Sequence, residues 1–175
     1  YAKQVITSRP SGGGALPAAI LPDFTKWGAI DRQPMRAIRR KTAEHMVLSR
    51  RVSPHVNTVF EIDYTRVSQV RARKKKEYAD RSVNLTYLAF IAKATADALR
   101  RHPAVNAAVS GESTILRRDI NLGIAVALEN GLIVPVIRSA DEKNVLGLQR
   151  SIVDLAQRAR SRQLKPEEVQ GGTFS

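Results

Sequence analysis

Residues 120–137, INLGIAVALENGLIVPVI, constrain the fold more than any other stretch of this sequence. Two runs rich in β-branched residues flank the dipeptide Asn130-Gly131, and this arrangement is the strongest short-range signal for a β-hairpin. Gly123, inside the first run, indicates a bulge or a close approach of another backbone segment. The stretch therefore predicts strands that fold back on each other, and the chain must contain a sheet.

Helical periodicity marks four further segments. Residues 34–51 carry one apolar stripe on a surface crowded with arginine, and residues 66–81 are so rich in Arg and Lys that an exposed basic helix is expected. Residues 84–103 are apolar around more than half of the helical circumference, which predicts a largely buried helix ended by Pro103. Residues 146–164 present a single apolar face formed by Leu148, Ile152, Leu155, Ala156 and Ala159.

Short strands are expected between these helices. Residues 56–65 alternate between apolar and polar side chains, which is typical of a half-buried strand, and shorter strands are expected at 104–109 and 114–118. The final residues, PEEVQGGTFS, turn at Gly171-Gly172 toward one more strand. Helices that alternate with strands and a hairpin predict an α/β fold with a mixed sheet flanked by helices.

The first 29 residues differ in composition from the rest. They contain RPSGGGALPAAILP, a mixture of Gly, Pro and small residues without a period that could bury one face. We expect a linker or N-terminal arm over residues 1–29 and one folded domain over residues 30–175.

The net charge is the one extreme bulk property. Lys and Arg number 29 against 16 Asp and Glu, a formal charge of +13, which favours polyanionic partners such as nucleic acid, phosphorylated cofactors or acidic domains. No zinc-ligand spacing or aromatic RNA-binding motif accompanies the charge, so nucleic acid is not the expected partner. Without cysteine, no disulfide, thiolate nucleophile or cysteine metal site can form. No apolar run is long enough to span a membrane, and we expect a cytoplasmic protein.

Candidate catalytic groups are sparse. The three histidines, His45, His55 and His102, do not stand at a spacing to another His, Asp or Ser that specifies a triad or a metal site. A structural role is favoured for each of them. The glycine-rich stretch at 11–14 lacks the Gly-Lys-Ser/Thr that completes a phosphate loop. From these residues alone, no complete catalytic constellation and no metal site is predicted.

Several motifs, taken together and in order, resemble one enzyme family. NLGIAVALENGLIVPVI followed by LKPEEVQGGTFS is similar to the catalytic domain of the dihydrolipoyllysine-residue acyltransferases, the core components of 2-oxo acid dehydrogenase complexes. IRRKTAEHM resembles the first helix of that family, SPHVNTVFEIDYT its following strand, and VNLTYLAFIAKATADALRRHPAVNA its buried helix. The resemblance extends from about residue 30 to residue 175.

The resemblance implies a chloramphenicol acetyltransferase-like fold, assembled as trimers that build a larger core. It implies transfer of an acyl group between coenzyme A and the lipoyl group of a separate lipoyl domain. The acyl group is expected to be acetyl, with succinyl and branched-chain groups as alternatives. In such a mechanism a His is the general base, an Asp accompanies it, and a Ser or Thr hydroxyl supports the oxyanion. Implied partners are lipoyl domains and the dehydrogenase and dihydrolipoamide dehydrogenase components.

The resemblance also locates the sites. The oxyanion hydroxyl is expected just beyond Ser175 and the His-x-x-x-Asp-Gly motif later still, so no residue of this chain is assigned as catalytic. We therefore expect a C-terminal part of the domain to be missing and the 175-residue chain to be inactive. Arg32 is near a coenzyme A-contacting arginine of the family, and Ala127 is at a position that lines the substrate channel.

Two hypotheses of other classes remain open from the sequence. The chain could be an assembly or binding scaffold that kept the fold without the chemistry. It could also be a basic nucleic-acid-binding domain, which predicts salt-sensitive binding to DNA or RNA that coenzyme A does not compete away.

Overall fold

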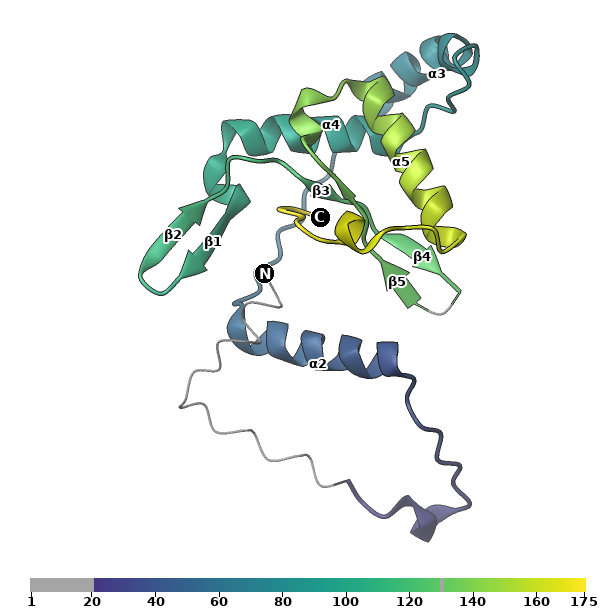
Figure 1. Ribbon diagram of the computed structural model, residues 1–175, viewed down its shortest axis with the longest axis vertical. Helices are drawn as coiled ribbons and strands as arrows, with labels where there is room; N and C mark the ends of the chain where they lie inside the picture. Colours follow the sequence, from purple (N-terminus) through teal and green to yellow (C-terminus); the bar gives the residue numbers. More distant parts are fainter. Residues whose placement is uncertain (1–20, 130) are drawn as a thin grey trace. The chain divides into compact units, whose positions relative to one another are not determined.

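The computed structural model describes residues 21–129 and 131–175, and it divides into two compact units, Tyr1–Val59 and Phe60–Ser175 (Figure 1). The predicted arm boundary at residues 29 and 30 falls inside the first unit and stays a prediction. Most of the predicted arm, residues 1–20, is outside the described residues.

The first unit contains one short and one long helix. The 3-10 helix η1 (Phe24–Trp27) begins after Asp23, whose side chain accepts the amide of Thr25, and α2 spans Ala37–Val52. The helix therefore begins three residues later than Pro34, where the sequence indicated its start. Its predicted apolar stripe is exposed, as Ile38 and Met46 show.

The second unit holds most of the secondary structure. Its helices are α3 (Thr65–Ala79), α4 (Tyr87–Arg101), η2 (Pro103–Asn106), η3 (Ala140–Glu142), α5 (Val145–Arg160) and η4 (Pro166–Val169). Its strands are β1 (Ala107–Ser110), β2 (Ser113–Leu116), β3 (Leu122–Gly123), β4 (Val126–Leu128), β5 (Gly131–Ile133) and β6 (Val136–Ile137). The α/β class predicted from the sequence is confirmed.

Residues 121–137 fold back on themselves as predicted. β4 pairs antiparallel with β5, and β3 pairs antiparallel with β6, so the segment forms two nested antiparallel pairs. Gly131 pairs with Leu128, which places this glycine in β5 rather than in the turn, and Asn130 is outside the described residues. Leu122 also forms a parallel bridge with Phe174. Because β3 has one antiparallel and one parallel neighbour, the pairing is mixed.

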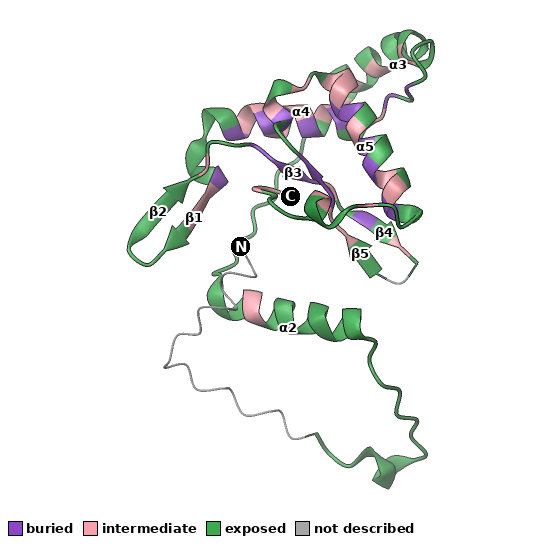
Figure 2. Ribbon diagram, viewed as in Figure 1, coloured by how far each residue is buried: buried purple, intermediate pink, exposed green. Residues whose placement is uncertain are grey.

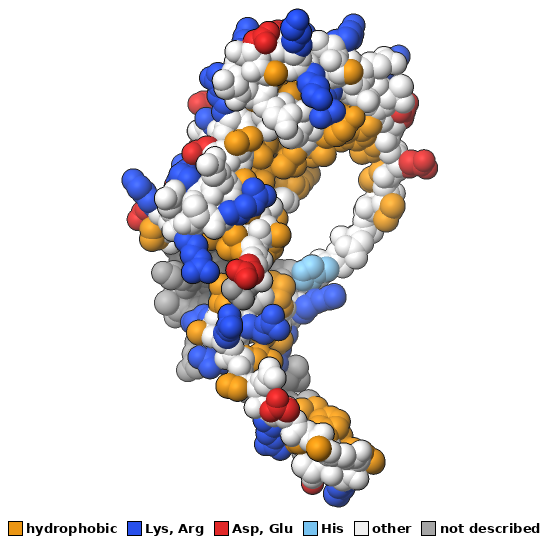
Figure 3. Space-filling model, turned by 90° about the vertical axis from the view of Figure 1, so that its right-hand side faces the viewer, with side chains coloured by type: hydrophobic (Ala, Val, Ile, Leu, Met, Phe, Trp, Pro, Cys, Tyr) orange, Lys and Arg blue, Asp and Glu red, His pale blue; other side chains and the backbone are white. Residues whose placement is uncertain are grey.

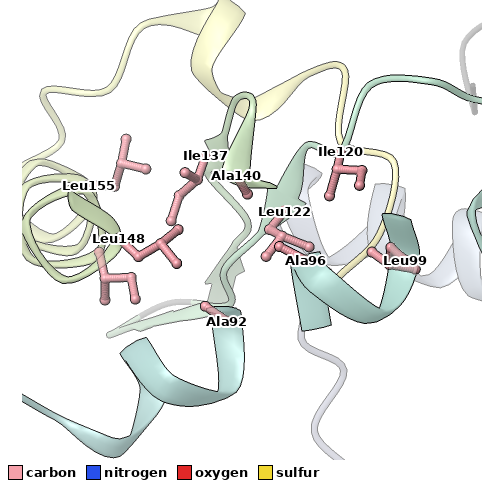
Figure 4. Packing of buried hydrophobic residues seen from close by; sticks show 10 residues of the cluster. Ala92, Ala96, Leu99, Ile120, Leu122, Ile137, Ala140, Leu148 and Leu155 are labelled. Atoms are coloured by element: carbon pink, nitrogen blue, oxygen red, sulfur yellow. The ribbon is translucent and has the colours of Figure 1, made fainter. Parts of the chain in front are cut away.

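The core lies between α4, α5 and the β3–β6 pair (Figure 4). Alanines on α4 let α5 and the strands approach closely, while leucines and isoleucines from the other elements fill the space between them. The cluster consists of Ala92, Ala96, Leu99, Ile120, Leu122, Ile137, Ala140, Leu148, Ile152 and Leu155. Buried residues are concentrated on these elements (Figure 2), whereas α3 has none, as expected for an exposed basic helix.

The buried face of α4 is narrower than the sequence indicates. Ala89, Ala92, Ala96 and Leu99 are buried, but Leu88 and Ile91 are 38% and 42% exposed. The prediction of burial around more than half the circumference is wrong because, in the described part of the chain, α5 and the strands pack against only one side of α4.

The strand predicted at residues 56–65 does not form. Residues 54–64 belong to no strand, and Val59 and Phe60 are 93% and 80% exposed. Alternating side chains create a strand only when a neighbouring backbone supplies hydrogen bonds, and no described segment pairs with this one. The side-chain pattern is that of a half-buried strand, but the partner that would bury it is absent from the described residues.

Candidate functional site

The most elaborate polar arrangement in the second unit joins β3 to residues 171–175. The amide of Gly123 donates to the carbonyl oxygen of Phe174 at 2.8 Å, and the amide of Thr173 donates to the carbonyl of Asn121 at 2.9 Å. The Gly-Gly turn predicted from the sequence thus delivers a short strand-like segment parallel to β3. We call residues 171–175 the terminal segment.

Asn121 is the centre of this arrangement. Its side chain is 8% exposed, its Nδ2 donates to the carbonyl of Gly171 at 3.1 Å, and its Oδ1 accepts the amide of Ser139 at 3.0 Å. Its backbone amide donates to Thr173 Oγ1 at 3.1 Å. One buried residue therefore connects the start of β3, the turn after β6 and the terminal segment. Ser139 has a left-handed backbone with φ of 47°, which its bond to Asn121 helps to maintain.

Two glycines are required for the close approach of these segments. A Cβ at Gly123 would lie 2.6 Å from Ser175 Oγ and 2.8 Å from Val134 Cγ1, so any other residue at this position would displace one or both of these side chains. Gly171 has φ of 78°, and a Cβ there would meet the Arg138 guanidinium. The glycine that suggested a bulge or close approach in the sequence therefore marks a close approach.

Arginines bind the terminal segment and the residues that precede it. Arg138 Nη2 donates to the carbonyls of Glu167 and Gln170 at 3.1 and 3.2 Å, and Arg117 Nη1 donates to that of Gly172 at 3.2 Å. The carbonyls of Glu167 and Gln170, in η4 and directly after it, accept hydrogen bonds from the charged guanidinium of Arg138. Hydrogen bonds from a charged donor are stronger than those from a neutral one. Part of the positive charge therefore takes part in hydrogen bonds within the chain.

Arg158 anchors η4 to α5. Its guanidinium forms a bidentate pair with Glu168, with both nitrogen–oxygen distances 2.7 Å, and it also contacts Asp154 one turn earlier on α5. Glu168 Oε2 in addition accepts the backbone amide of Lys165, the residue before η4, while the Glu168 amide donates to the Lys165 carbonyl. The hydrogen bonds from Arg158 and then from Lys165 lower the pKa of Glu168 to about 2. The pKa of Arg158 is raised by its hydrogen bonds to Glu168 and then to Asp154.

The two predicted cofactor-site residues, Arg32 for contact with coenzyme A and Ala127 for the lining of the substrate channel, are both exposed. Arg32 is in the irregular segment before α2, and its side chain has no hydrogen bond or ion pair among the described residues. Ala127 is in β4, opposite Leu132 of β5. They belong to different units, and their proposed roles stay predictions.

The histidines are exposed as well. His55 Nε2 is 3.5 Å from Ser49 Oγ in the first unit, a long contact without a carboxylate, and His102 caps the end of α4. Within residues 21–129 and 131–175, no group of three or more His, Asp or Glu could hold a metal ion. In the same ranges, no helix has the length and apolar character needed to cross a membrane.

Sequence reasoning did not identify Asn121, Arg138 or Arg158. An Asn directly before the strand residues LG was a usable signal, since a polar side chain at the start of a buried strand needs hydrogen-bond partners. Arg138 gave no local signal, because the carbonyls that it binds are 29 and 32 residues away along the chain. Arg158 has one local partner, Asp154 on the same helix, but its partner Glu168 is 10 residues away and outside that helix.

Residues 28–175 match the model of one protein family, described as 2-oxoacid dehydrogenases acyltransferase (catalytic domain). The chain belongs to this family. The match covers most of the chain, including β3, the nested strands and the terminal segment. The resemblance noted from the sequence is therefore confirmed.

Curated relatives of this family member fall into three acyl classes. It is 36% identical over 94% of its length to the dihydrolipoyllysine-residue acetyltransferase component of the pyruvate dehydrogenase complex of Cupriavidus necator, covering 30% of that protein. It is 38% identical over 81% of its length to the branched-chain lipoamide acyltransferase component of Bacillus subtilis, covering 34%. The succinyltransferase component of the 2-oxoglutarate dehydrogenase complex of the same organism is 35% identical over 83%, with 35% covered. The chain thus spans about a third of the length of these relatives.

Solved structures confirm the fold. The cubic core of the pyruvate dehydrogenase multienzyme complex aligns with a TM-score of 0.85 and 32% identity, covering 90% of this chain and 65% of that one. A probable dihydrolipoamide acetyltransferase of Listeria monocytogenes aligns with a TM-score of 0.78 and 36% identity, covering 83% of this chain and 62% of that one.

Proposed function

We propose that this family member is the acyltransferase core of a 2-oxo acid dehydrogenase complex, transferring an acyl group between dihydrolipoyl-lysine and coenzyme A. The observation that carries the proposal is the family match over residues 28–175 on a fold that aligns with a pyruvate dehydrogenase core. The relatives are named as acyltransferase components of such complexes, which supports the same reaction.

Acetyl is the proposed acyl group. Several relatives from different bacteria, including Cupriavidus necator and Mycobacterium tuberculosis, are named acetyltransferases, while succinyl and branched-chain transferases are also similar. The choice among the three groups is made by the assay below.

In the proposed reaction the sulfur of one thiol attacks the acyl carbonyl carbon of the other partner's thioester. A general base takes the thiol proton, a tetrahedral oxyanion forms, and the departing sulfur receives a proton when the intermediate collapses. No acyl-enzyme forms. We assign the base and its Asp to polypeptide outside residues 1–175. In this proposal, residues 1–175 position the substrates and the catalytic groups.

We further propose that Arg32 contacts a phosphate of coenzyme A and that Ala127 lines the substrate channel without contributing charge. Arg32 suits this role because its guanidinium is exposed and uncommitted within the described residues. The lipoyl group is carried by a separate lipoyl domain.

Assembly is the remaining proposal. We propose a homotrimer that builds a larger core and is served by lipoyl domains, a dehydrogenase and dihydrolipoamide dehydrogenase. The similar solved structures include a multienzyme core, and large apolar side chains at 56–62 are more exposed than monomers usually tolerate.

The test is acyl transfer to dihydrolipoamide from acetyl-, succinyl- and isobutyryl-coenzyme A. It is measured on the protein made from its complete reading frame and, in parallel, on the 175-residue chain. We expect transfer by the former, fastest with acetyl, and none by the latter. Absence of transfer with all three donors would favour the scaffold hypothesis. Activity of the 175-residue chain would place the base among residues 1–175 and contradict our assignment.

A further inference from the structure

The terminal segment is held against β3 by hydrogen bonds to its side chains as well as to its backbone. Its residues accept hydrogen bonds from Asn121, Gly123 and Arg117, while Arg138 fixes the turn that precedes them. A two-residue strand with one parallel neighbour is only marginally stable by itself, so these added contacts determine where the segment lies.

We propose that Asn121 is a positioning residue, which fixes the terminal segment parallel to β3 while Gly123 leaves the space that the Ser175 side chain occupies. The assignment depends on the three groups of Asn121, because each of them bonds to a different residue. The Nδ2 group holds Gly171, the backbone holds Thr173, and Oδ1 holds the left-handed turn at Ser139. All three bonds are needed to keep three segments in one register.

The catalytic consequence rests on the proposed acyl transfer. Groups that stabilise an oxyanion must be held within fractions of an ångström, and a displacement of about 1 Å can cost about 10²-fold in rate. Ser175 Oγ lies 2.6 Å from the point that a Cβ on Gly123 would occupy, so this hydroxyl is closely apposed to β3. The oxyanion hydroxyl itself is expected just beyond Ser175, so any slip of the terminal segment also moves the backbone that leads to that hydroxyl.

Asn106 provides a matched control. It is also a buried asparagine, 1% exposed, and its Nδ2 donates to the carbonyls of Arg117 and Asp119 rather than to the terminal segment. Asn106→Asp and Asn121→Asp each replace a buried side-chain amide with a carboxyl group of nearly the same shape, and they remove two and one donated hydrogen bonds respectively. Both variants are expected to lower the thermal midpoint, Asn106→Asp by at least as much as Asn121→Asp, and only Asn121→Asp should release the terminal segment.

The experiment measures hydrogen exchange of the backbone amides in peptides covering residues 171–175, on protein made from the complete reading frame. We expect Asn121→Asp to speed exchange at Thr173 and Phe174 at least about tenfold, and Asn106→Asp to leave it near the wild-type rate. Equal exchange in the two variants would overturn the proposal. Gly123→Ala should have the same effect as Asn121→Asp, because the new Cβ displaces Ser175.

Thr173 supplies a second pair of variants in case Asn121→Asp does not fold. Thr173→Val removes the hydroxyl that bonds to both the amide and the carbonyl of Asn121, whereas Thr173→Ser retains it. Faster exchange in Thr173→Val with recovery in Thr173→Ser is expected. Identical exchange in these two variants contradicts the proposal.

Kinetics separate positioning from a merely structural role. Asn121→Asp should lower kcat for acetyl transfer about tenfold or more at nearly unchanged KM, and Asn106→Asp should not. Faster exchange with an unchanged kcat overturns the positioning role. If the wild-type protein transfers no acyl group, the proposed function fails, while the exchange measurements still decide whether Asn121 holds the segment.

Discussion

The ion pair between Arg158 and Glu168 connects α5 to η4, two elements whose contact is not indicated by the sequence pattern. The pair joins α5 to η4 across a turn and also caps η4 through the amide of Lys165. Its carboxylate is stabilised in the folded chain, because the pKa of Glu168 falls to about 2 from an ordinary value of 4.5. The stabilisation is therefore complete above the ordinary pKa and is lost as the pH falls from about 5 toward 2.

This linkage gives a pH-dependent prediction. Glu168→Gln should lower the urea midpoint at pH 7 and reduce its further decline between about pH 5 and pH 2, because no carboxylate remains to be protonated there. Glu112→Gln, in the exposed turn of the β1–β2 hairpin, is the control and should keep the wild-type profile. Urea unfolding curves recorded at several pH values measure both variants. The prediction is contradicted if the urea midpoint falls equally between about pH 5 and pH 2 in the wild type and in both variants.

Arg32 gives a prediction at the same scale. Arg32→Gln should raise KM for coenzyme A several-fold and leave the thermal midpoint unchanged, since the guanidinium has no partner among the described residues. Steady-state kinetics with coenzyme A and 3′-dephospho-coenzyme A measure the effect. Unchanged KM for both would remove Arg32 from the proposed binding site.

At the scale of elements, α5 is the helix that completes the core of the second unit. Leu148 is fully buried between α4 and the strands, and the neighbouring Gln149 accepts the amide and hydroxyl of Thr86 at the start of α4. Gln149 therefore provides the cap that α4 lacks from its own residues.

Truncation of Leu148 tests this packing. Leu148→Ala should lower the free energy of unfolding by about 2–5 kcal/mol, because it removes buried apolar area and leaves a cavity. Val153→Ala on the exposed side of the same helix should cost less than about 1 kcal/mol. Urea unfolding measures both, and comparable losses would show that α5 does not pack as described.

At the scale of the whole molecule, positive charge and exposed apolar surface coexist. Lys and Arg side chains are spread over the visible face with fewer Asp and Glu among them (Figure 3), in keeping with a formal charge of +13. Apolar side chains at 56–62 are exposed in the same chain. The first property favours anionic ligands such as coenzyme A, and the second favours association with further copies.

The proposed assembly gives the last prediction. Light scattering coupled to size exclusion should give the mass of a trimer or of a multiple of three protomers. Phe60→Ser should shift the population toward smaller species, because Phe60 is 80% exposed and its burial between protomers would stabilise the assembled form. Val153→Ala is the control, and an equal shift in both variants would contradict a specific role for residues 56–62.

The sequence alone determined the features that depend on neighbouring residues. The apolar face of α5, the basic α3 and the folding back of 121–137 follow from periodicity and turn chemistry, which act over a few residues. The family resemblance likewise came from short motifs in order. Gly123 was recognised as a bulge or a position of close approach, because a glycine inside a strand pattern offers no side chain to pack and leaves room for a neighbouring backbone.

Only the tertiary structure decided which segments meet. The alternating pattern at 56–65 indicates which side chains would share a face, but it cannot supply a neighbouring strand. The strand predicted from this pattern is therefore wrong. Likewise, the sequence does not show that Asn121 holds Gly171 and Thr173, about 50 residues later, or that Arg158 meets Glu168. Hydrogen bonds of this kind depend on the distance between atoms in the folded chain, and local pattern contains no measure of that distance.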